Sequence, residues 1–296
     1  MFGWQDVSVI HAVSNFPSKK FVKMVFTPMM IRRRVFVCGL GAQLAGVAFP
    51  GNSAVGSRLN IGVGTFSYHT LSMDEMIVQL RRWGIREVEM SRGEFMLMKP
   101  PTVEMCQSAR EKFDRAGIHC TSYYTATIKD DRDLDYAVRY AQILGASNVS
   151  GDATGPILNR IDEQFTQHGL TFGIHNHWFK GGFPYQSVDD VEKALAGLSK
   201  TVGATLDVGQ MAACGYDPVD AVRRLAPRLR VVHLKDVAGS GAEHNVLLGH
   251  GIARIPQVMS ELKRIRYTGL VAIEYEKDGN SNEDMKILIQ YARQLA

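Results

Sequence analysis

The sequence is poor in cysteine, and its cysteines form neither a disulfide framework nor a thiolate metal site. Four cysteines occur among 296 residues, and Cys38 lies within the N-terminal 58 residues. The other three, Cys106, Cys120 and Cys214, are odd in number and widely spaced, and they contain no C-x-x-C pair. We therefore expect buried structural thiols and a fold that does not depend on disulfides.

An excess of basic charge is absent from most of the chain, although the formal net charge is +4. Residues 1–58 hold seven of the 34 lysines and arginines and one of the 30 acidic residues, which leaves 27 basic and 29 acidic residues in 59–296. That balance gives little electrostatic reason to bind nucleic acid. We expect no nucleic-acid partner.

No apolar run is long enough for a typical membrane-spanning helix. The longest candidate, residues 35–49, has about fifteen residues, whereas a span needs about twenty. It follows the pair Arg33-Arg34 and precedes small residues at 52–57, which is the layout of a secretory signal of the twin-arginine (Tat) type. The sequence predicts a Tat-like leader over 1–58, export to the periplasm or beyond, and no membrane span after cleavage. An uncleaved anchor is the alternative.

A glycine-rich phosphate-binding turn after the first apolar run is also missing. Such a turn would indicate an open, doubly wound sheet. Gly62 and Gly64 form only a weak G-x-G match, and they lie inside the expected first strand.

From residue 59 onward, short apolar runs alternate with amphipathic segments, several of which stop at a glycine. This alternation requires parallel strands with right-handed crossovers. Eight such units in about 237 residues fit a TIM barrel. We expect one single-domain α/β fold, a (β/α)8 barrel, over 59–296. The expected strands are 60–66, 85–90, 118–123, 146–150, 170–175, 203–207, 229–234 and 270–275, and the expected helices are 73–83, 103–116, 133–144, 157–168, 188–198, 218–225, 255–265 and 283–295.

Several of these strands end in a side chain that can bind a metal ion. In a parallel barrel such ends share one rim, and ionisable groups crowded there shift one another's pKa or repel unless a counter-charge is present. Mixed histidine and carboxylate ligands suit Mn²⁺, Zn²⁺, Co²⁺ or Fe²⁺ better than Ca²⁺. We expect one divalent metal, with Mn²⁺ preferred and Mg²⁺ as a further alternative. The converging residues are Glu89, His175, Asp207, His233 and Glu274.

Five motifs in the second half resemble the sugar phosphate isomerase/epimerase superfamily, the xylose isomerase-like TIM barrels. They are GIHNH (173–177), LDVGQ (206–210), VHLKD (232–236), LGHG (248–251) and IEYE (273–276). The family's ketose epimerases bind one metal through a carboxylate on strand five, an Asp on six, a His on seven and a Glu on eight. The resemblance therefore implies Asp207, His233 and Glu274 as ligands. His175 stands at the strand-five position, as in a His-Asn-His subgroup.

The resemblance implies a metal-dependent isomerase or epimerase that acts on a sugar or keto-sugar through an enediolate. Because His175 replaces a carboxylate, we expect proton transfer by Glu274 on one face and by His175 or His177 on the other. Lys235 either neutralises a developing oxyanion or forms a surface salt bridge with Asp236. The expected substrate contacts are Glu89, Gln210, Trp178 and Arg254; the alternatives are an ion pair for Glu89, packing for Trp178 and an exposed helix start for Arg254.

Other functions stay open. A lyase or dehydratase of the same fold would eliminate from a keto-sugar or keto-glycoside, and a non-catalytic barrel would only bind sugar. The AP endonucleases share the fold and use three metals, but Gln210 stands where their Asp-x-x-His motif needs a histidine. We expect a small carbohydrate as partner, and the sequence leaves a homo-oligomer open.

Overall fold

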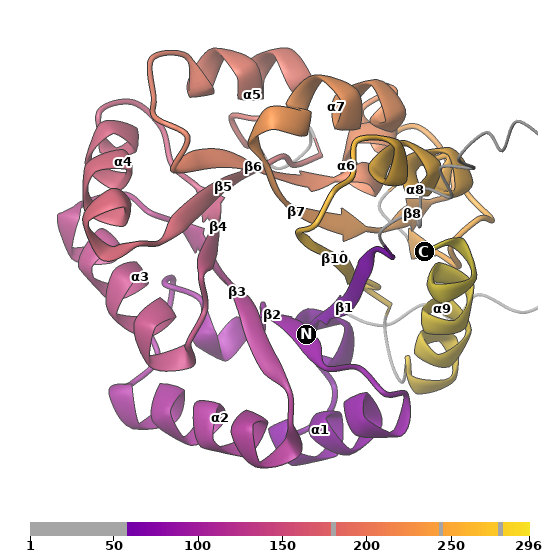
Figure 1. Ribbon diagram of the computed structural model, residues 1–296, viewed down its shortest axis with the longest axis horizontal. Helices are drawn as coiled ribbons and strands as arrows, with labels where there is room; N and C mark the ends of the chain where they lie inside the picture. Colours follow the sequence, from indigo (N-terminus) through magenta and orange to yellow (C-terminus); the bar gives the residue numbers. More distant parts are fainter. Residues whose placement is uncertain (1–57, 179–181, 243–244, 278–280) are drawn as a thin grey trace, which may run out of the picture. The chain divides into compact units, whose positions relative to one another are not determined.

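The computed structural model describes residues 58–178, 182–242, 245–277 and 281–296, so the expected leader and its signal lie outside the described residues except for Arg58. Eight parallel strands close into a barrel in the order β1-β10-β7-β6-β5-β4-β3-β2. Figure 1 looks along the barrel, and helices surround the strands. The expected (β/α)8 fold is therefore confirmed.

The barrel strands are short, and most helices lie between consecutive strands. The strands of the barrel are β1 (Asn60–Gly64), β2 (Glu87–Met90), β3 (His119–Thr127), β4 (Asn148–Asp152), β5 (Thr171–His175), β6 (Val202–Asp207), β7 (Leu229–Leu234) and β10 (Leu270–Ile273). The α-helices are α1 (Met73–Arg82), α2 (Val103–Ala116), α3 (Asp131–Leu144), α4 (Ile157–His168), α5 (Val188–Leu195), α6 (Val208–Ala213), α7 (Pro218–Leu225), α8 (Ile255–Arg264) and α9 (Asn282–Leu295). Short 3₁₀ turns are η1 (Thr65–Tyr68), η2 (Gly93–Phe95) and η4 (Ala226–Arg228).

Helix ends follow local chemistry, which is why the sequence located them well. Ser72 and Ser187 each form a capping box at the start of α1 and α5. Gly117 ends α2 with φ +66°, a conformation that costs glycine little. The expected bounds of α2, α4 and α7 agree with the structure.

Strand ends agree less well, because pairing with neighbours decides them. β3 continues to Thr127, where it pairs with Asp152 across a register shift, and Ala126 adopts φ +63° at that irregularity. β4 consequently ends at Asp152 and not at Ser150 as expected. The sequence also missed α6 and the two-stranded sheet of β8 (Asp236–Val237) and β9 (Asn245–Val246).

The barrel interior contains a layer of small hydroxyl groups in addition to apolar side chains. Ser122, Ser150 and Thr205 are fully buried. Ser150 Oγ lies 3.2 Å from Ser122 Oγ and 2.7 Å from Thr205 Oγ1. These hydroxyls satisfy one another and offer a hydrogen bond to the layer above them, which supports the polar groups of the rim.

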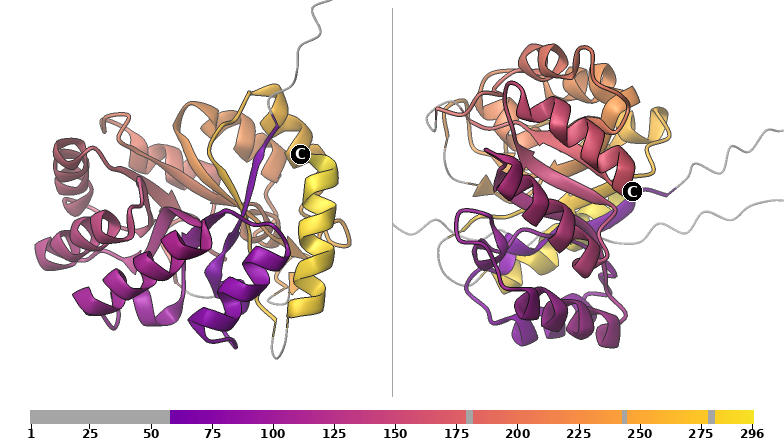
Figure 2. Two further views of the ribbon diagram at one scale, coloured as in Figure 1. Left: turned by 60° about the horizontal axis from the view of Figure 1, so that its bottom comes forward. Right: turned by 90° about the vertical axis from the view of Figure 1, so that its left-hand side faces the viewer.

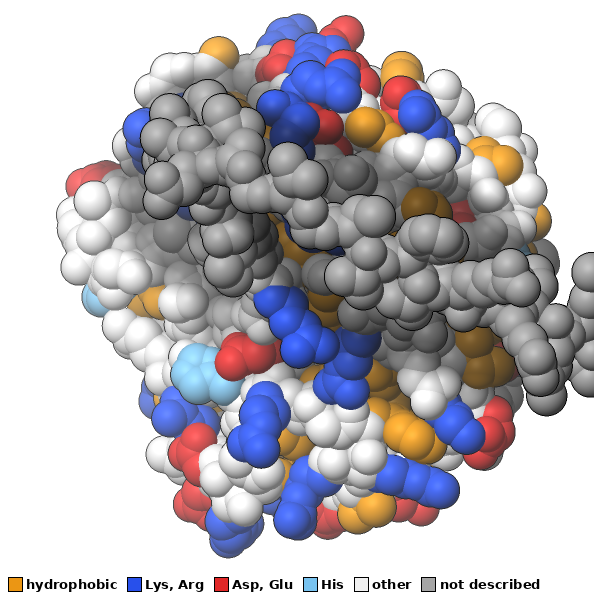
Figure 3. Space-filling view, turned by 45° about the vertical axis from the view of Figure 1, so that its right-hand side comes forward, with side chains coloured by type: hydrophobic (Ala, Val, Ile, Leu, Met, Phe, Trp, Pro, Cys, Tyr) orange, Lys and Arg blue, Asp and Glu red, His pale blue; other side chains and the backbone are white. Residues whose placement is uncertain are grey.

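The surface of the described part is mixed in charge. On the face shown in Figure 3, lysine and arginine side chains are interspersed with acidic ones, in agreement with the near-neutral balance of residues 59–296. Both further views show the helices outside the strands (Figure 2). Among the described residues, no helix has the length and apolar character needed to cross a bilayer.

Candidate active site

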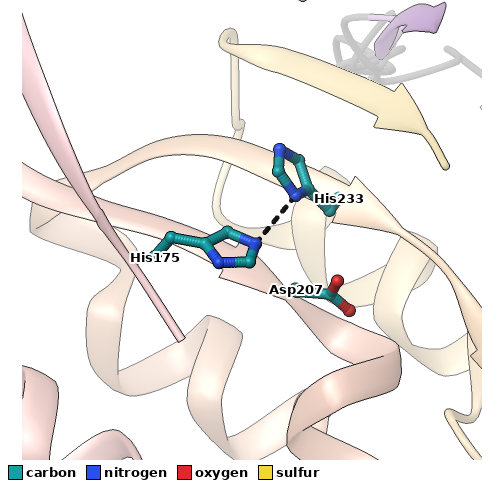
Figure 4. Close-up of side chains that lie close together, drawn as sticks. All are labelled: His175, Asp207 and His233. Carbon is teal, nitrogen blue, oxygen red and sulfur yellow. Dashed lines mark hydrogen bonds between the residues drawn. The ribbon is translucent and has the colours of Figure 1, made fainter. Parts of the chain in front are cut away.

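Four side chains from neighbouring strands meet at the carboxyl ends of β5, β6, β7 and β10. His175 ends β5, Asp207 ends β6, His233 lies near the end of β7, and Glu274 follows β10 directly. In Figure 4 the rings of His175 and His233 face each other across the dashed line, and Asp207 lies close to them. His175 Nε2 lies 3.0 Å from His233 Nδ1, and Glu274 Oε2 lies 3.4 Å from that same nitrogen. The convergence expected from the strand ends is present.

A carboxylate on the far side of the ring sets the orientation of His233. Glu89, at the end region of β2, places Oε2 2.5 Å from His233 Nε2, while Ser122 Oγ donates to Glu89 Oε1 at 2.7 Å. Glu89 is fully buried. Because Nε2 is held by this carboxylate, Nδ1 is the nitrogen that faces His175 and Glu274.

Burial opposes the charged form of His233, but the nearby carboxylates Glu274 and Glu89 outweigh burial and raise its pKa to about 9. His175 shows the opposite effect. Burial, together with the adjacent imidazoles of His177 and His233, holds the pKa of His175 well below its usual range. His175 is therefore a neutral imidazole with a lone pair to offer, and His233 carries the proton when no other cation is present.

The chemistry of this donor set fits a divalent cation. One ligand atom each from His175, Asp207 and His233 lie within 4.8 Å of one another, and so do those of Glu89, His233 and Glu274. Ligands bound at about 2.1 Å to one ion lie about 3.0 Å apart in octahedral and about 3.4 Å apart in tetrahedral coordination, and the two imidazole nitrogens lie 3.0 Å apart. With Glu89 behind His233, the residues that would hold the ion are His175, Asp207, His233 and Glu274.

Lys235 supplies a positive charge beside the two carboxylates of this set. Its Nζ lies 3.1 Å from Asp207 Oδ2, 3.2 Å from Glu274 Oε2 and 2.8 Å from Glu276 Oε1, and the side chain is 2% exposed. Burial disfavours the ammonium, but Asp207, Glu276 and Glu274 hold the pKa of Lys235 well above its usual range. The ammonium therefore reduces the electrostatic repulsion between the carboxylates of Asp207 and Glu274.

The alternative of a surface salt bridge between Lys235 and Asp236 is wrong, because both side chains are buried and Asp236 has other partners. Its carboxylate accepts backbone N–H groups of Gly249, Gly251 and Ala253 at 2.9 to 3.0 Å. Asp236 thus organises the loop after β7. Lys235, two residues after His233, is directed into the site instead.

Glu274 reaches the site because a glycine lies opposite it. A Cβ at Gly64, the last residue of β1, would lie 2.6 Å from Glu274 Cγ and 2.7 Å from Oε1. Burial raises the pKa of Glu274, while His233 and Lys235 act against that rise. A raised pKa makes this carboxylate a stronger base, as suits a group that accepts and returns a proton.

Asn176, the middle residue of His-Asn-His, links two of the strands that carry the ligands. Its Oδ1 accepts from the backbone N–H of Asp207 at 2.8 Å, and its Nδ2 donates to the carbonyl of Asp207 at 3.0 Å. Asp207 Oδ1 in turn accepts from the backbone N–H of Gln210 at 2.8 Å. These hydrogen bonds therefore fix the position of the end of β6 relative to β5.

His177 lies beside the four-residue set, where Asp152 holds it. Its Nε2 lies 3.0 Å from Asp152 Oδ2 and 3.0 Å from His175 Nδ1. Its ring stacks on Phe183 with a centroid separation of 3.9 Å and an interplanar angle of 17°. Sequence reasoning missed Asp152, because strand four was expected to stop at Ser150. An acidic residue two positions past an apolar run was the available signal.

These groups line one side of a cavity of about 290 Å³. Tyr124 from β3 also lines it and meets the ring of His175 edge-on at 5.3 Å. Of the residues that the sequence analysis proposed for the site, those that line this cavity are His175, His177, Gln210, His233, Lys235 and Glu274.

A family model described as a xylose isomerase-like TIM barrel matches residues 77–295, well over half of the chain. The chain belongs to that family.

The similarity to individual proteins is more distant. Over 145 residues, 44% of each chain, it is 26% identical to the rhizopine catabolism protein MocC of Rhizobium meliloti. Over 159 residues, 47% of this chain and 52% of the relative, it is 28% identical to the inosose dehydratase of Mesomycoplasma hyopneumoniae. The chain spans about half the length of the curated relatives that it matches.

Solved structures confirm the architecture. A sugar phosphate isomerase/epimerase from Parabacteroides distasonis superposes with a TM-score of 0.63 at 19% identity, covering 79% of this chain and 95% of that chain. Likeness at this level of identity shows a shared fold. The xylose isomerase-like fold therefore agrees between the family match and the structural comparison.

Within this xylose isomerase-like barrel, three of the expected substrate contacts do not line the main cavity. Glu89 is an ion-pair partner of His233 beneath it. Trp178 lines a smaller neighbouring cavity of about 140 Å³. Arg254 directly precedes α8 with φ +55°, and its half-exposed guanidinium pairs with Asp217 at 2.6 Å. Glu89 therefore forms an ion pair and Arg254 lies at a helix start, which were the alternatives to substrate contact. Gln210, in contrast, lines both cavities.

Proposed function

We propose that this protein is a divalent-metal-dependent isomerase or epimerase that moves a proton next to the carbonyl of a sugar or keto-sugar. The observation that carries the proposal is the meeting of His175, Asp207, His233 and Glu274, of which His175, His233 and Glu274 line the cavity. A sugar-sized molecule can enter that cavity, and a second proton-transfer group lies in its wall.

The bound cation would polarise the carbonyl and stabilise the negative charge that develops on the substrate oxygens. Mn²⁺ is the preferred ion for two imidazoles and two carboxylates, with Zn²⁺, Co²⁺, Fe²⁺ or Mg²⁺ as alternatives. His175 is the strand-five ligand in this proposal, because its Nε2 faces His233 while His177 faces Asp152.

Two groups of the chain would exchange protons with the substrate. Glu274 takes a proton from carbon on one side of the substrate, leaving an enediolate. His177, held by Asp152, delivers or removes a proton on the other side. Return of the proton to a different carbon, or to the opposite face of the same carbon, gives isomerisation or epimerisation.

Lys235 acts on the charge that builds up between these two groups. Its ammonium already contacts Glu274 and Glu276 at the cavity wall, and it lines the cavity itself. A cation held there without conformational freedom stabilises a developing oxyanion more than a mobile one would.

Elimination is a second candidate, and the similarity to an inosose dehydratase favours it. The first step is the same proton abstraction by Glu274. The enediolate then expels a β-hydroxyl or β-alkoxyl group, and His177 donates the proton that leaves with it. His177, held by Asp152 beside the metal-binding set, supplies the imidazole acid that this outcome needs.

The decisive experiment is product identification by NMR in D₂O. The Mn²⁺-loaded protein is incubated with a panel of sugars, inositols, keto-inositols and 3-keto-glycosides. Solvent deuterium on carbon with an isomeric product supports isomerisation, and an unsaturated product supports elimination. Metal bound without exchange or elimination on any compound contradicts both and leaves a sugar-binding barrel.

A further inference from the structure

The cavity has two chemically different sides, and the proposed function uses only one of them. The charged side carries His175, His233 and Glu274 of the metal-binding set, together with His177 and Lys235. The lining also contains large apolar side chains, which we call the apolar rim: Phe66, Met96, Met98 and Phe183.

The apolar rim exposes more apolar surface than a polyol needs. Met98 is 76% exposed and Phe183 is 38% exposed, although each also lines the cavity. Large apolar side chains left in water beside a cavity mark a binding surface more often than chance placement would.

A buried leucine and two hydrogen bonds hold the loop that carries Met96 and Met98, so these two side chains are kept out of the core. Leu97, between them, is buried, and its N–H donates to the carbonyl of Thr125 at 3.0 Å. Tyr123 Oη donates to the carbonyl of Phe95 at 2.5 Å, just before the methionine pair. Because Leu97 points into the core, its neighbours Met96 and Met98 are turned toward the cavity.

The loop is also held after the methionines, where Tyr140 Oη donates to the carbonyl of Pro101 at 2.7 Å. Hydrogen bonds from tyrosine side chains to backbone carbonyls on both sides of Met96 and Met98 therefore fix the position of this loop. The thioether side chains themselves keep rotational freedom and adapt to apolar groups of varied shape.

The described cavity lining offers little for an anionic group. Among its described residues Lys235 is the only lysine or arginine, and its ammonium is shared by three carboxylates. A phosphate ester would meet Glu274, Glu276 and Asp152 on the same wall, which repels it.

We propose that the substrate is an uncharged keto-glycoside, with its keto-sugar ring at the charged side and an aryl or alkyl aglycone on the apolar rim. This inference rests on the proposed function for the position of the sugar ring. Phe183 joins the two sides, because it stacks on His177 and also belongs to the rim. A flat aglycone would continue that stack toward Met98.

The test compares matched ligands by titration calorimetry on the metal-loaded protein. The probes are the methyl and phenyl β-glycosides of glucose, galactose, xylose and mannose, with the 6-phosphates of the three hexoses. We expect at least one phenyl glycoside to bind ten times more tightly than its methyl counterpart, a difference of about 1.4 kcal/mol. Equal affinities, tighter binding of a phosphate, or no binding by any phenyl glycoside overturns the proposal.

Two variants locate the effect. Met98→Ser should reduce the phenyl-to-methyl ratio to below threefold, and Met96→Ser should lower it as well. Met105→Ser is the matched control, because Met105 is a partly exposed methionine on α2 beside a different cavity. An unchanged ratio in both rim variants contradicts the apolar rim.

The binding test and the deuterium test fail independently. Binding needs no turnover, so deuterium exchange without a phenyl preference removes the aglycone site and leaves the proposed function in place. A phenyl preference that depends on Met98, with no exchange on any keto-sugar, supports the binding site and contradicts the enzyme.

Discussion

The half of the barrel from β5 to β10 supplies the donor atoms of the site, whereas the half from β1 to β4 supplies three of the four residues of the apolar rim and two supporting carboxylates. His175, Asp207, His233 and Glu274 all come from the second half. Met96, Met98 and Tyr124 come from the first, in the loop after β2 and on β3.

The two halves are coupled through carboxylate–histidine pairs. Glu89 of β2 holds His233 of β7, and Asp152 of β4 holds His177 after β5. In each pair the first half orients an imidazole that the second half presents. Strand ends in one half therefore act on the substrate, while those of the other half decide which nitrogen of each ring is available.

The largest effects should follow removal of the donors themselves. Glu274→Gln and His233→Ala should each lower kcat by at least a thousandfold, because one removes the proton-transfer group and both remove a metal ligand. Turnover is followed by NMR, and metal content by atomic emission. Arg254→Gln, outside the cavity, is the control. If both site variants keep full activity, the second half does not hold the site.

Breaking the Asp152–His177 pair should cost less and should leave the metal in place. Asp152→Asn keeps the shape of the side chain but removes its charge, so we expect kcat to fall about a hundredfold. Metal affinity should stay within twofold. Asp162→Asn, an exposed carboxylate that bonds Ser199, is the matched control. A loss of metal binding equal to the loss of kcat would instead place Asp152 among the ligands.

Breaking the Glu89–His233 pair should weaken metal binding. Glu89→Gln should weaken metal affinity by about 10- to 100-fold, because Glu89 orients His233 and raises its basicity. Glu87→Gln, two residues earlier on the same strand, serves as control. Competition against a fluorescent chelator measures the affinity. An unchanged metal affinity would mean that Nδ1 of His233 faces the ion without help from the hydrogen bond between Nε2 and Glu89.

The last prediction concerns the pH dependence of stability. The pKa of His233 rises from 6.5 to about 9 on folding of the metal-free protein, so the folded state binds the extra proton. That stabilisation is complete below pH 6.5 and is lost as pH rises to 9. Linkage limits it to roughly 3 kcal/mol. Chemical unfolding in chelator at several pH values measures it.

Metal loading gives the matching control for the pH experiment. A metal ligand must be an unprotonated imidazole, so the loaded protein should lack the decline between pH 6.5 and 9. An equal decline with and without metal would assign it to a group other than His233.

The sequence alone determined the architecture of residues 59–296 and the identity of the converging residues. Strand–helix alternation, helix caps and terminal glycines are local signals, and they were sufficient for the barrel and for helices such as α2 and α7. His175, Asp207, His233 and Glu274 were identifiable because a parallel barrel brings all strand ends to one rim. Export through residues 1–58 stays a prediction.

Only the tertiary structure decided which groups touch. The partnership of Glu89 with His233 joins residues 144 positions apart, and the role of Asp152 depends on where β4 ends against β3. The sequence left Lys235 either in the site or in a surface salt bridge with Asp236, and the structure shows it between Asp207 and Glu274. Such contacts depend on barrel closure and strand register, which are set by pairing between distant segments and leave no pattern in any single stretch of chain.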